Sequence, residues 1–117
     1  MSTIEKAIWL SYDLGIGGDY PGLYKWLDNH KAIECGNSVA FFSYKIANNK
    51  LNQLPEVVYN DIIKNVNLRA GDRLYIIRRE VEESSTLIKG SFIFGRRKSN
   101  PWDGYGDVSS VGSEDGQ

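Results

Sequence analysis

Asp13 has the clearest chemical potential in this sequence, because it ends an apolar run and precedes a glycine-rich loop. The run Lys6–Asp13 is rich in β-branched and aromatic residues, which is typical of a strand, and Gly15–Gly18 follows it closely. A carboxylate at a strand end can bind a hard cation such as Mg²⁺, which needs only one or two protein carboxylates and otherwise keeps its waters. Such an ion could activate water or stabilise a leaving phosphate. The alternative is that Asp13 only accepts backbone N–H groups of the loop.

A second group of chemically active side chains is basic and lies in the C-terminal half of the chain. Its members are Arg78, Arg79, Arg96, Arg97 and Lys98. Guanidinium groups bind phosphates in a bidentate manner, and the nearby rings of Trp102 and Tyr105 could stack on unpaired bases. We therefore predict that the basic group binds DNA or RNA. The alternative is that these charges protect an edge strand and a solvated turn.

Composition limits which metal sites, crosslinks and cellular locations are possible for this chain. The chain has a net charge of −1, but residues 64–98 hold nine basic and four acidic side chains. Cys35 is the single cysteine, which excludes an internal disulfide, and His30 is the single histidine, which excludes a zinc cluster built from several histidines of one chain. We expect His30 to interact with the negative end of a helix. The N-terminus lacks the pattern of a signal peptide, and no apolar run is long enough to span a bilayer, so we expect a cytoplasmic protein with no membrane partner.

Hydrophobic periodicity and turn residues predict one α+β domain over residues 1–105, followed by an acidic tail that we expect to be disordered over 106–117. Asp19 or Tyr20 caps the first predicted helix, and Pro21 opens it. The expected elements, in order, are a strand at 6–13, a helix at about 21–30, strands at 32–35 and 38–46, a helix at 55–66, and strands at 73–81 and 86–94. This is a ferredoxin-like βαββαβ plan with an added C-terminal strand, in which two helices cover one face of an antiparallel sheet.

The other face of this predicted sheet also carries large apolar side chains. In the first strand Ile8, Leu10 and Tyr12 share one face, whereas Trp9 points to the opposite one. Two helices can cover only one face, and monomers rarely expose a large apolar patch. We therefore predict a homodimer in which a second copy covers the uncovered face. The alternative is that residues 86–94 and the C-terminal arm fold over it.

Three short segments resemble the small ferredoxin-like CRISPR adaptation proteins, which are the partner subunits of the CRISPR integrase, and their relatives of the virulence-associated protein D type. They are Leu10–Leu14 (LSYDL), Asn37–Phe42 (NSVAFF) and Gly71–Ile77 (GDRLYII). The resemblance covers about residues 6–79. It implies a homodimer in which the position of Asp13 approaches its counterpart and can hold a divalent metal.

The resemblance also implies a function in antiviral defence. Some members of that family are metal-dependent nucleases and others are DNA-binding scaffolds, so it implies nucleic-acid binding with Mg²⁺-dependent phosphodiester cleavage at Asp13 as a candidate activity. An integrase-like protein is then a candidate partner. The alternative from another class is a non-catalytic protein-interaction module, such as an accessory protein of a toxin–antitoxin or phage-defence system, in which Phe92–Tyr105 docks onto a partner protein.

Overall fold

The computed structural model describes residues 2–107, and its longest element is the first strand, β1 (Thr3–Asp13). This strand begins three residues before the predicted start, because Thr3 already pairs with Ala47 of β3. Ile8, Leu10 and Tyr12 are buried, as the predicted alternation requires. Most of the predicted acidic tail, residues 108–117, lies outside the described residues.

The other elements follow the predicted order with one addition. They are α1 (Tyr20–Asn29), β2 (Ile33–Glu34), β3 (Val39–Ala47), the 3₁₀ helix η1 (Asn48–Gln53), α2 (Leu54–Ile63), β4 (Arg73–Glu82) and β5 (Ser85–Phe94). The addition is η1, which lies between β3 and α2, where no helix was predicted. Helix α2 ends before the predicted Val66, since Asn65 and Val66 both donate their N–H groups to the carbonyl of Ile62 in a closing turn.

The strands form one five-stranded antiparallel sheet in the order β2-β3-β1-β4-β5. The predicted α+β class, with an antiparallel sheet and two helices, is therefore confirmed. The sheet is not the regular ferredoxin-like βαββαβ sheet, because β2 has only two residues and β5 extends the sheet beyond β4.

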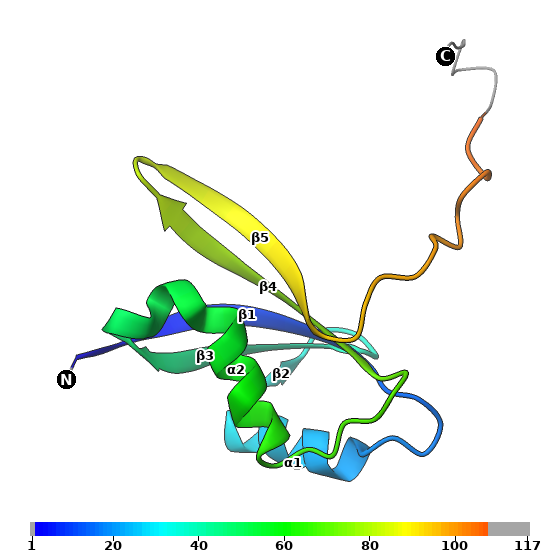
Figure 1. Ribbon diagram of the computed structural model, residues 1–117, viewed down its shortest axis with the longest axis horizontal. Coiled ribbons are helices and arrows are strands. Elements are labelled where there is room, and N and C mark those ends of the chain that lie inside the picture. Colours follow the sequence, from blue (N-terminus) through cyan, green and yellow to red (C-terminus); the bar gives the residue numbers. More distant parts are fainter. Residues whose placement is uncertain (1, 108–117) are drawn as a thin grey trace.

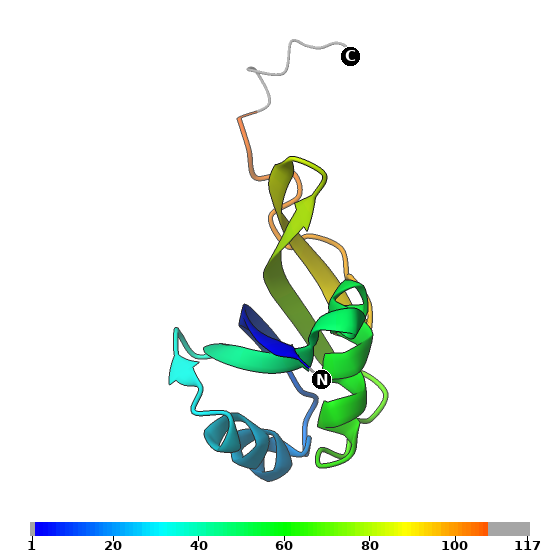
Figure 2. The same ribbon diagram turned by 90° about the vertical axis from the view of Figure 1, so that its left-hand side faces the viewer.

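Both helices pack on the same face of the sheet, and the core lies between them and the strands (Figure 2). Helix α1 contributes the buried Leu23, Trp26 and Leu27. Helix α2 contributes a second apolar stripe, which begins at Leu54 and continues one turn at a time through Val58 and Ile62. The opposite face of the sheet is here called the helix-free face. It carries the side chains that alternate along each strand with the buried ones.

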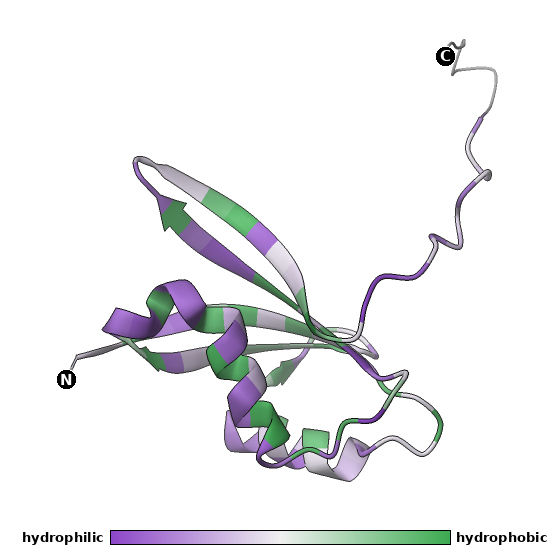
Figure 3. Cartoon of the chain, in the orientation of Figure 1, coloured by the Kyte–Doolittle hydropathy of each residue, from purple (hydrophilic) through white to green (hydrophobic). Residues whose placement is uncertain are grey.

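The sheet divides into two arms beyond Ile8 and Arg78. Strand β1 pairs with β4 only from Ile8↔Arg78 to Asp13↔Arg73, whereas β1 continues along β3 and β4 continues along β5. Figure 1 shows the resulting β4–β5 hairpin diverging from β1 and β3, and Figure 3 shows apolar and polar segments interleaved along it. Among the described residues, no helix is both long and apolar enough to cross a membrane.

Candidate nucleic-acid interface

Aromatic side chains gather on the helix-free face, in two neighbouring rows of the sheet. We call this set the aromatic platform, and its members are Trp9, Phe41, Tyr75 and Phe92. Trp9 pairs with Phe41 across β1 and β3, with ring centroids 4.7 Å apart. Tyr75 pairs with Phe92 across β4 and β5, also at 4.7 Å and edge to face. Because Trp9 lies opposite Ile77 and Tyr75 is two residues away from it, the two pairs are diagonal neighbours.

Arg97 reaches back over this platform from the segment that follows β5. Its guanidinium carbon lies 5.4 Å from the ring centroid of Phe92 and 5.8 Å from that of Tyr75. The chain turns back at Gly95, which has a φ of +77° and lies so close to Asp72 that a Cβ atom would be 2.5 Å from the Asp72 carbonyl oxygen. Only glycine suits this position. Gly95 therefore directs Arg97 onto the aromatic rings.

Asp13 and Arg73 lie at one end of the platform, as register partners on β1 and β4. Arg73 Nη2 donates a hydrogen bond to Asp13 Oδ2 at 2.9 Å, and the Arg73 guanidinium carbon also lies 5.8 Å from the Phe92 centroid. These residues line a hollow of about 270 Å³ together with Ser11, Tyr75 and Arg97. The structure thus brings together two sequence-predicted site residues, Asp13 and Arg97, that are far apart in the chain.

The loop between β1 and α1, which follows Asp13, is held by two aspartates. Asp72 is buried, and its carboxylate accepts the N–H groups of Gly15 at 2.7 Å and Arg69 at 2.8 Å. Asp19 accepts the N–H of Gly22, which confirms it as the cap of α1, and it also accepts the N–H of Asn67. The hydrogen bonds from Asn67 and Gly22 lower the pKa of Asp19. The carboxylates of Asp72 and Asp19 therefore connect the two ends of this loop to the segment before β4.

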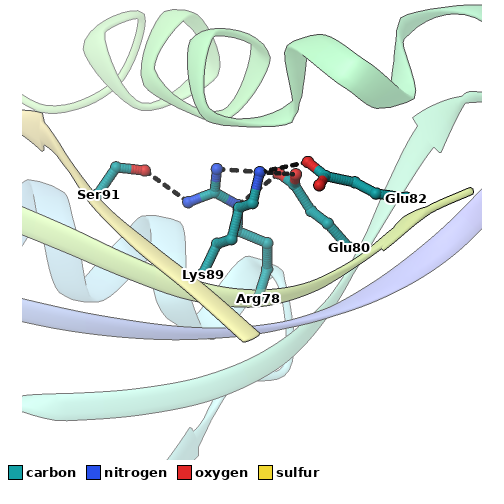
Figure 4. Close-up of polar contacts among 5 residues, drawn as sticks. All are labelled: Arg78, Glu80, Glu82, Lys89 and Ser91. Atoms are coloured by element: carbon teal, nitrogen blue, oxygen red, sulfur yellow. Dashed lines mark hydrogen bonds and ion pairs between the residues drawn. The ribbon is translucent and has the colours of Figure 1, made fainter. Parts of the chain in front are cut away.

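Arg78 does not join the other predicted nucleic-acid-binding residues. It lies on the helix side of β4 and is only 7% exposed, with Glu80 and Ser91 as hydrogen-bond partners (Figure 4). Lys89 contacts Glu80 and Glu82 in the same cluster. Burial would raise the pKa of Glu80, but hydrogen bonds and charge from Arg78 and Lys89 outweigh it and lower that pKa. The predicted set of five basic residues is therefore divided between the two faces of the sheet.

The remaining basic residues of the predicted set are accessible. Arg79 follows Arg78 and so belongs to the helix-free face, where it is exposed opposite Ile88. Arg96 and Lys98 flank Arg97 in the exposed segment after β5. Arg79 thus adds positive charge to the helix-free face, and Arg96 and Lys98 are sequence neighbours of Arg97, which contacts the aromatic platform.

Asp13 lies apart from other metal-binding side-chain types in the part of the chain that the structure describes. Among residues 2–107, no group of three or more histidine, cysteine, aspartate or glutamate side chains is arranged to hold a metal ion. The one carboxylate at this place is already in contact with a guanidinium, which would have to move before a cation could bind. In one chain, a cation at Asp13 would therefore have a single protein carboxylate as ligand and would have to displace Arg73.

A polar cluster that the sequence interpretation did not identify lies at the open edge of β3. Tyr44 Oη donates to Asp61 Oδ2 at 2.8 Å, and His30 Nε2 is 3.8 Å from the same oxygen, beside a hollow of about 640 Å³. Burial, together with the contact to Asp61, raises the pKa of Tyr44. His30 also bonds the Trp26 carbonyl through Nδ1 and stacks on the Trp26 ring, so it closes the C-terminal end of α1 as predicted. These contacts join residues from three elements, which no local spacing signals.

Comparisons of the chain with known proteins found no relative. No family model matches the chain, and searches of curated proteins and of solved structures found no significant match.

Proposed function

We propose that this protein binds single-stranded nucleic acid on its helix-free face. The observation that carries the proposal is Arg97 lying over Tyr75 and Phe92, diagonally beside the Trp9–Phe41 pair. Unpaired bases stack on exposed aromatic rings and on guanidinium planes, and stacking of one base contributes roughly 1–3 kcal/mol. A duplex buries its base faces, so the platform suits a single strand.

Backbone phosphates would be held by positive charges on the helix-free face and in the segment after β5. These are Arg79, Arg96, Arg97 and Lys98, within the stretch of the chain that carries most of its positive charge. Each phosphate contact releases counterions, and single strands give a log–log salt slope of about −0.7 per contact. Binding through these four residues would therefore have a slope of roughly −3.

The test is fluorescence anisotropy with labelled single-stranded DNA, single-stranded RNA and duplex DNA over a salt series. Arg97→Ala and Phe92→Ala should each weaken single-strand binding by about fivefold to tenfold, at the lower part of the stacking range. Lys25→Ala is the matched control, because Lys25 is an exposed cation on α1, on the other side of the sheet. Absence of binding at low salt, or equal losses in Arg97→Ala and Lys25→Ala, would contradict the proposal.

A homodimer is the second part of the proposal, and a different observation favours it. Ile33, Val81 and Ile88 are 61–70% exposed. The strand registers place all three on the helix-free face, with Ile33 at the β2 edge and Val81 and Ile88 in the outer part of the β4–β5 hairpin. Aliphatic side chains offer no stacking surface for bases, and exposed apolar side chains on an uncovered sheet face favour a protein interface. A second copy of the chain over this aliphatic part would also cover Arg79, the register partner of Ile88. It would leave the Asp13 end of the platform and the basic residues 96–98 for nucleic acid.

We interpret the fold as a ferredoxin-like plan with an added edge strand, which would agree with the resemblance to CRISPR adaptation proteins. Cleavage at Asp13 would then need a second carboxylate from the other protomer and displacement of Arg73. Incubation of labelled strands with Mg²⁺ tests this activity, and Asp13→Ala should abolish any cleavage. An integrase-like partner, or docking of the Phe92–Tyr105 arm in a protein-interaction module, would appear as a stable complex with proteins encoded beside this one.

A further inference from the structure

The hollow at the end of the aromatic platform combines an acceptor and a donor side by side. Arg73 holds Asp13 through Oδ2, while Asp13 Oδ1 has no hydrogen-bond partner among the described residues. The Asp13 side chain is 58% exposed and borders the same hollow as Tyr75 and Phe92. A carboxylate accepts hydrogen bonds only, whereas the guanidinium of Arg73 donates only. The pair therefore offers a fixed pattern of acceptor next to donor at the edge of a stacking surface.

The carboxylate of Asp13 is unexpected on a surface that we propose to bind phosphates. Its negative charge repels the nucleic-acid backbone, and an exposed ion pair such as Asp13–Arg73 contributes little to stability. A base edge resolves this conflict, because the exocyclic amino and ring N–H groups of bases donate to carboxylates. Asp13 would then act on the bases, while the basic residues assigned above to the phosphates hold the backbone.

We propose that Asp13 and Arg73 form a base-reading subsite that prefers guanine, an inference that rests on the proposed binding of single strands. Guanine presents two neighbouring donors, N1–H and the 2-amino group, next to the acceptor O6. The donors match the Asp13 carboxylate, and O6 matches Arg73. Adenine and cytosine offer a single amino group on this edge, and thymine and uracil flank their one N–H with two carbonyl oxygens that repel the carboxylate.

The experiment measures anisotropy with a short oligothymidylate that carries one central guanine, and with a matched oligomer that carries hypoxanthine there instead. Hypoxanthine lacks only the 2-amino group, so the ratio of the two dissociation constants isolates one donor. We expect the guanine oligomer to bind about fivefold more tightly, which is the lower end of discrimination by a well-placed side-chain contact. Oligomers with central adenine or cytosine complete the series.

Asp13→Asn should bring this ratio closer to one while binding to plain oligothymidylate persists, because the amide has a single acceptor oxygen for the two donors of guanine. Asp28→Asn is the control, since Asp28 is an exposed aspartate of α1 whose loss changes the net charge equally. An unchanged ratio in Asp13→Asn, or tighter binding of the adenine or cytosine oligomer, overturns the guanine subsite but leaves single-strand binding standing. If no oligomer binds at all, the proposed function itself is wrong.

Discussion

The ring of Tyr75 on β4 lies directly over Gly90 on the neighbouring strand β5. A Cβ atom at Gly90 would overlap with Tyr75 Oη and would come within 2.7 Å of two ring carbons. Gly90 is the register partner of Ile77, two residues along β4 from Tyr75, so the ring extends diagonally across the hairpin. The missing side chain leaves room for the Tyr75 ring, which also contacts Phe92 edge to face.

Gly90→Ala should therefore displace the Tyr75 ring. We expect a loss of about 1 kcal/mol in the free energy of unfolding, as for mild overpacking, together with weaker single-strand binding. In a Tyr75→Ala background the same substitution should be neutral or slightly stabilising, because alanine is less flexible than glycine in a strand. Urea unfolding of the four proteins of this double-mutant cycle measures the coupling. Additive effects would show that the ring and Gly90 do not interact.

Asp72 connects the loop after β1 to the turn before β4. Its buried carboxylate accepts the N–H groups of both Gly15 and Arg69, so Asp72→Ala leaves two backbone donors without their acceptor. We expect a loss of about 3 kcal/mol in the free energy of unfolding. Asp72→Asn, which keeps one acceptor oxygen, should lose less. Asp103→Ala is a surface control expected to change stability by less than about 0.5 kcal/mol, and an equal effect of the two alanine variants would contradict the role of Asp72.

Asp19 should make part of the stability depend on acidic pH. Hydrogen bonds from Asn67 and Gly22 lower its pKa in the folded protein, so the ionised form is favoured by folding. The stabilisation is present above the unfolded value of about 3.9 and is lost as the pH falls through the lower folded pKa. The difference in Tm between the wild type and Asp19→Ala should therefore be constant from neutral pH to about pH 5 and shrink below about pH 4. A difference that persists unchanged in stronger acid would exclude the ionised carboxylate as its cause.

Local patterns predicted the face of each strand residue better than they predicted the site. Alternation correctly separated Ile8 and Leu10 from Trp9, because β1 is paired without a register shift with β3 from Thr3 to Ser11. The same alternation places Arg78 and Arg79 on opposite faces of the sheet. The prediction that both bind one nucleic acid did not take this alternation into account. The position of Arg97 could not be predicted, since it depends on the turn at Gly95 and its packing against Asp72.

Arg78 provides a test that separates folding from binding. Arg78→Met removes a buried cation and leaves Glu80 with only Lys89 as its charged partner. We expect the free energy of unfolding to fall by about 2–3 kcal/mol, because breaking a partly buried ion pair leaves an uncompensated charge. Single-strand affinity should stay within about twofold, in contrast to the loss expected for Arg97→Ala. A strong loss of affinity in a folded Arg78→Met protein would mean that the helix side of the hairpin also binds nucleic acid.

Ile88→Glu tests the second copy over the aliphatic part of the helix-free face. Ile88 is 70% exposed in one chain, so a carboxylate there has no cost in the isolated protomer, but it would be buried without a partner in the dimer. Sedimentation equilibrium of the wild type should give twice the mass of the chain, and Ile88→Glu should give the mass of one chain with an unchanged circular dichroism spectrum. Tyr24→Glu, at an exposed position on α1, is the matched control and should remain dimeric. A wild-type protein that sediments as a single chain at all concentrations would leave the whole helix-free face, aliphatic part included, available to a single strand.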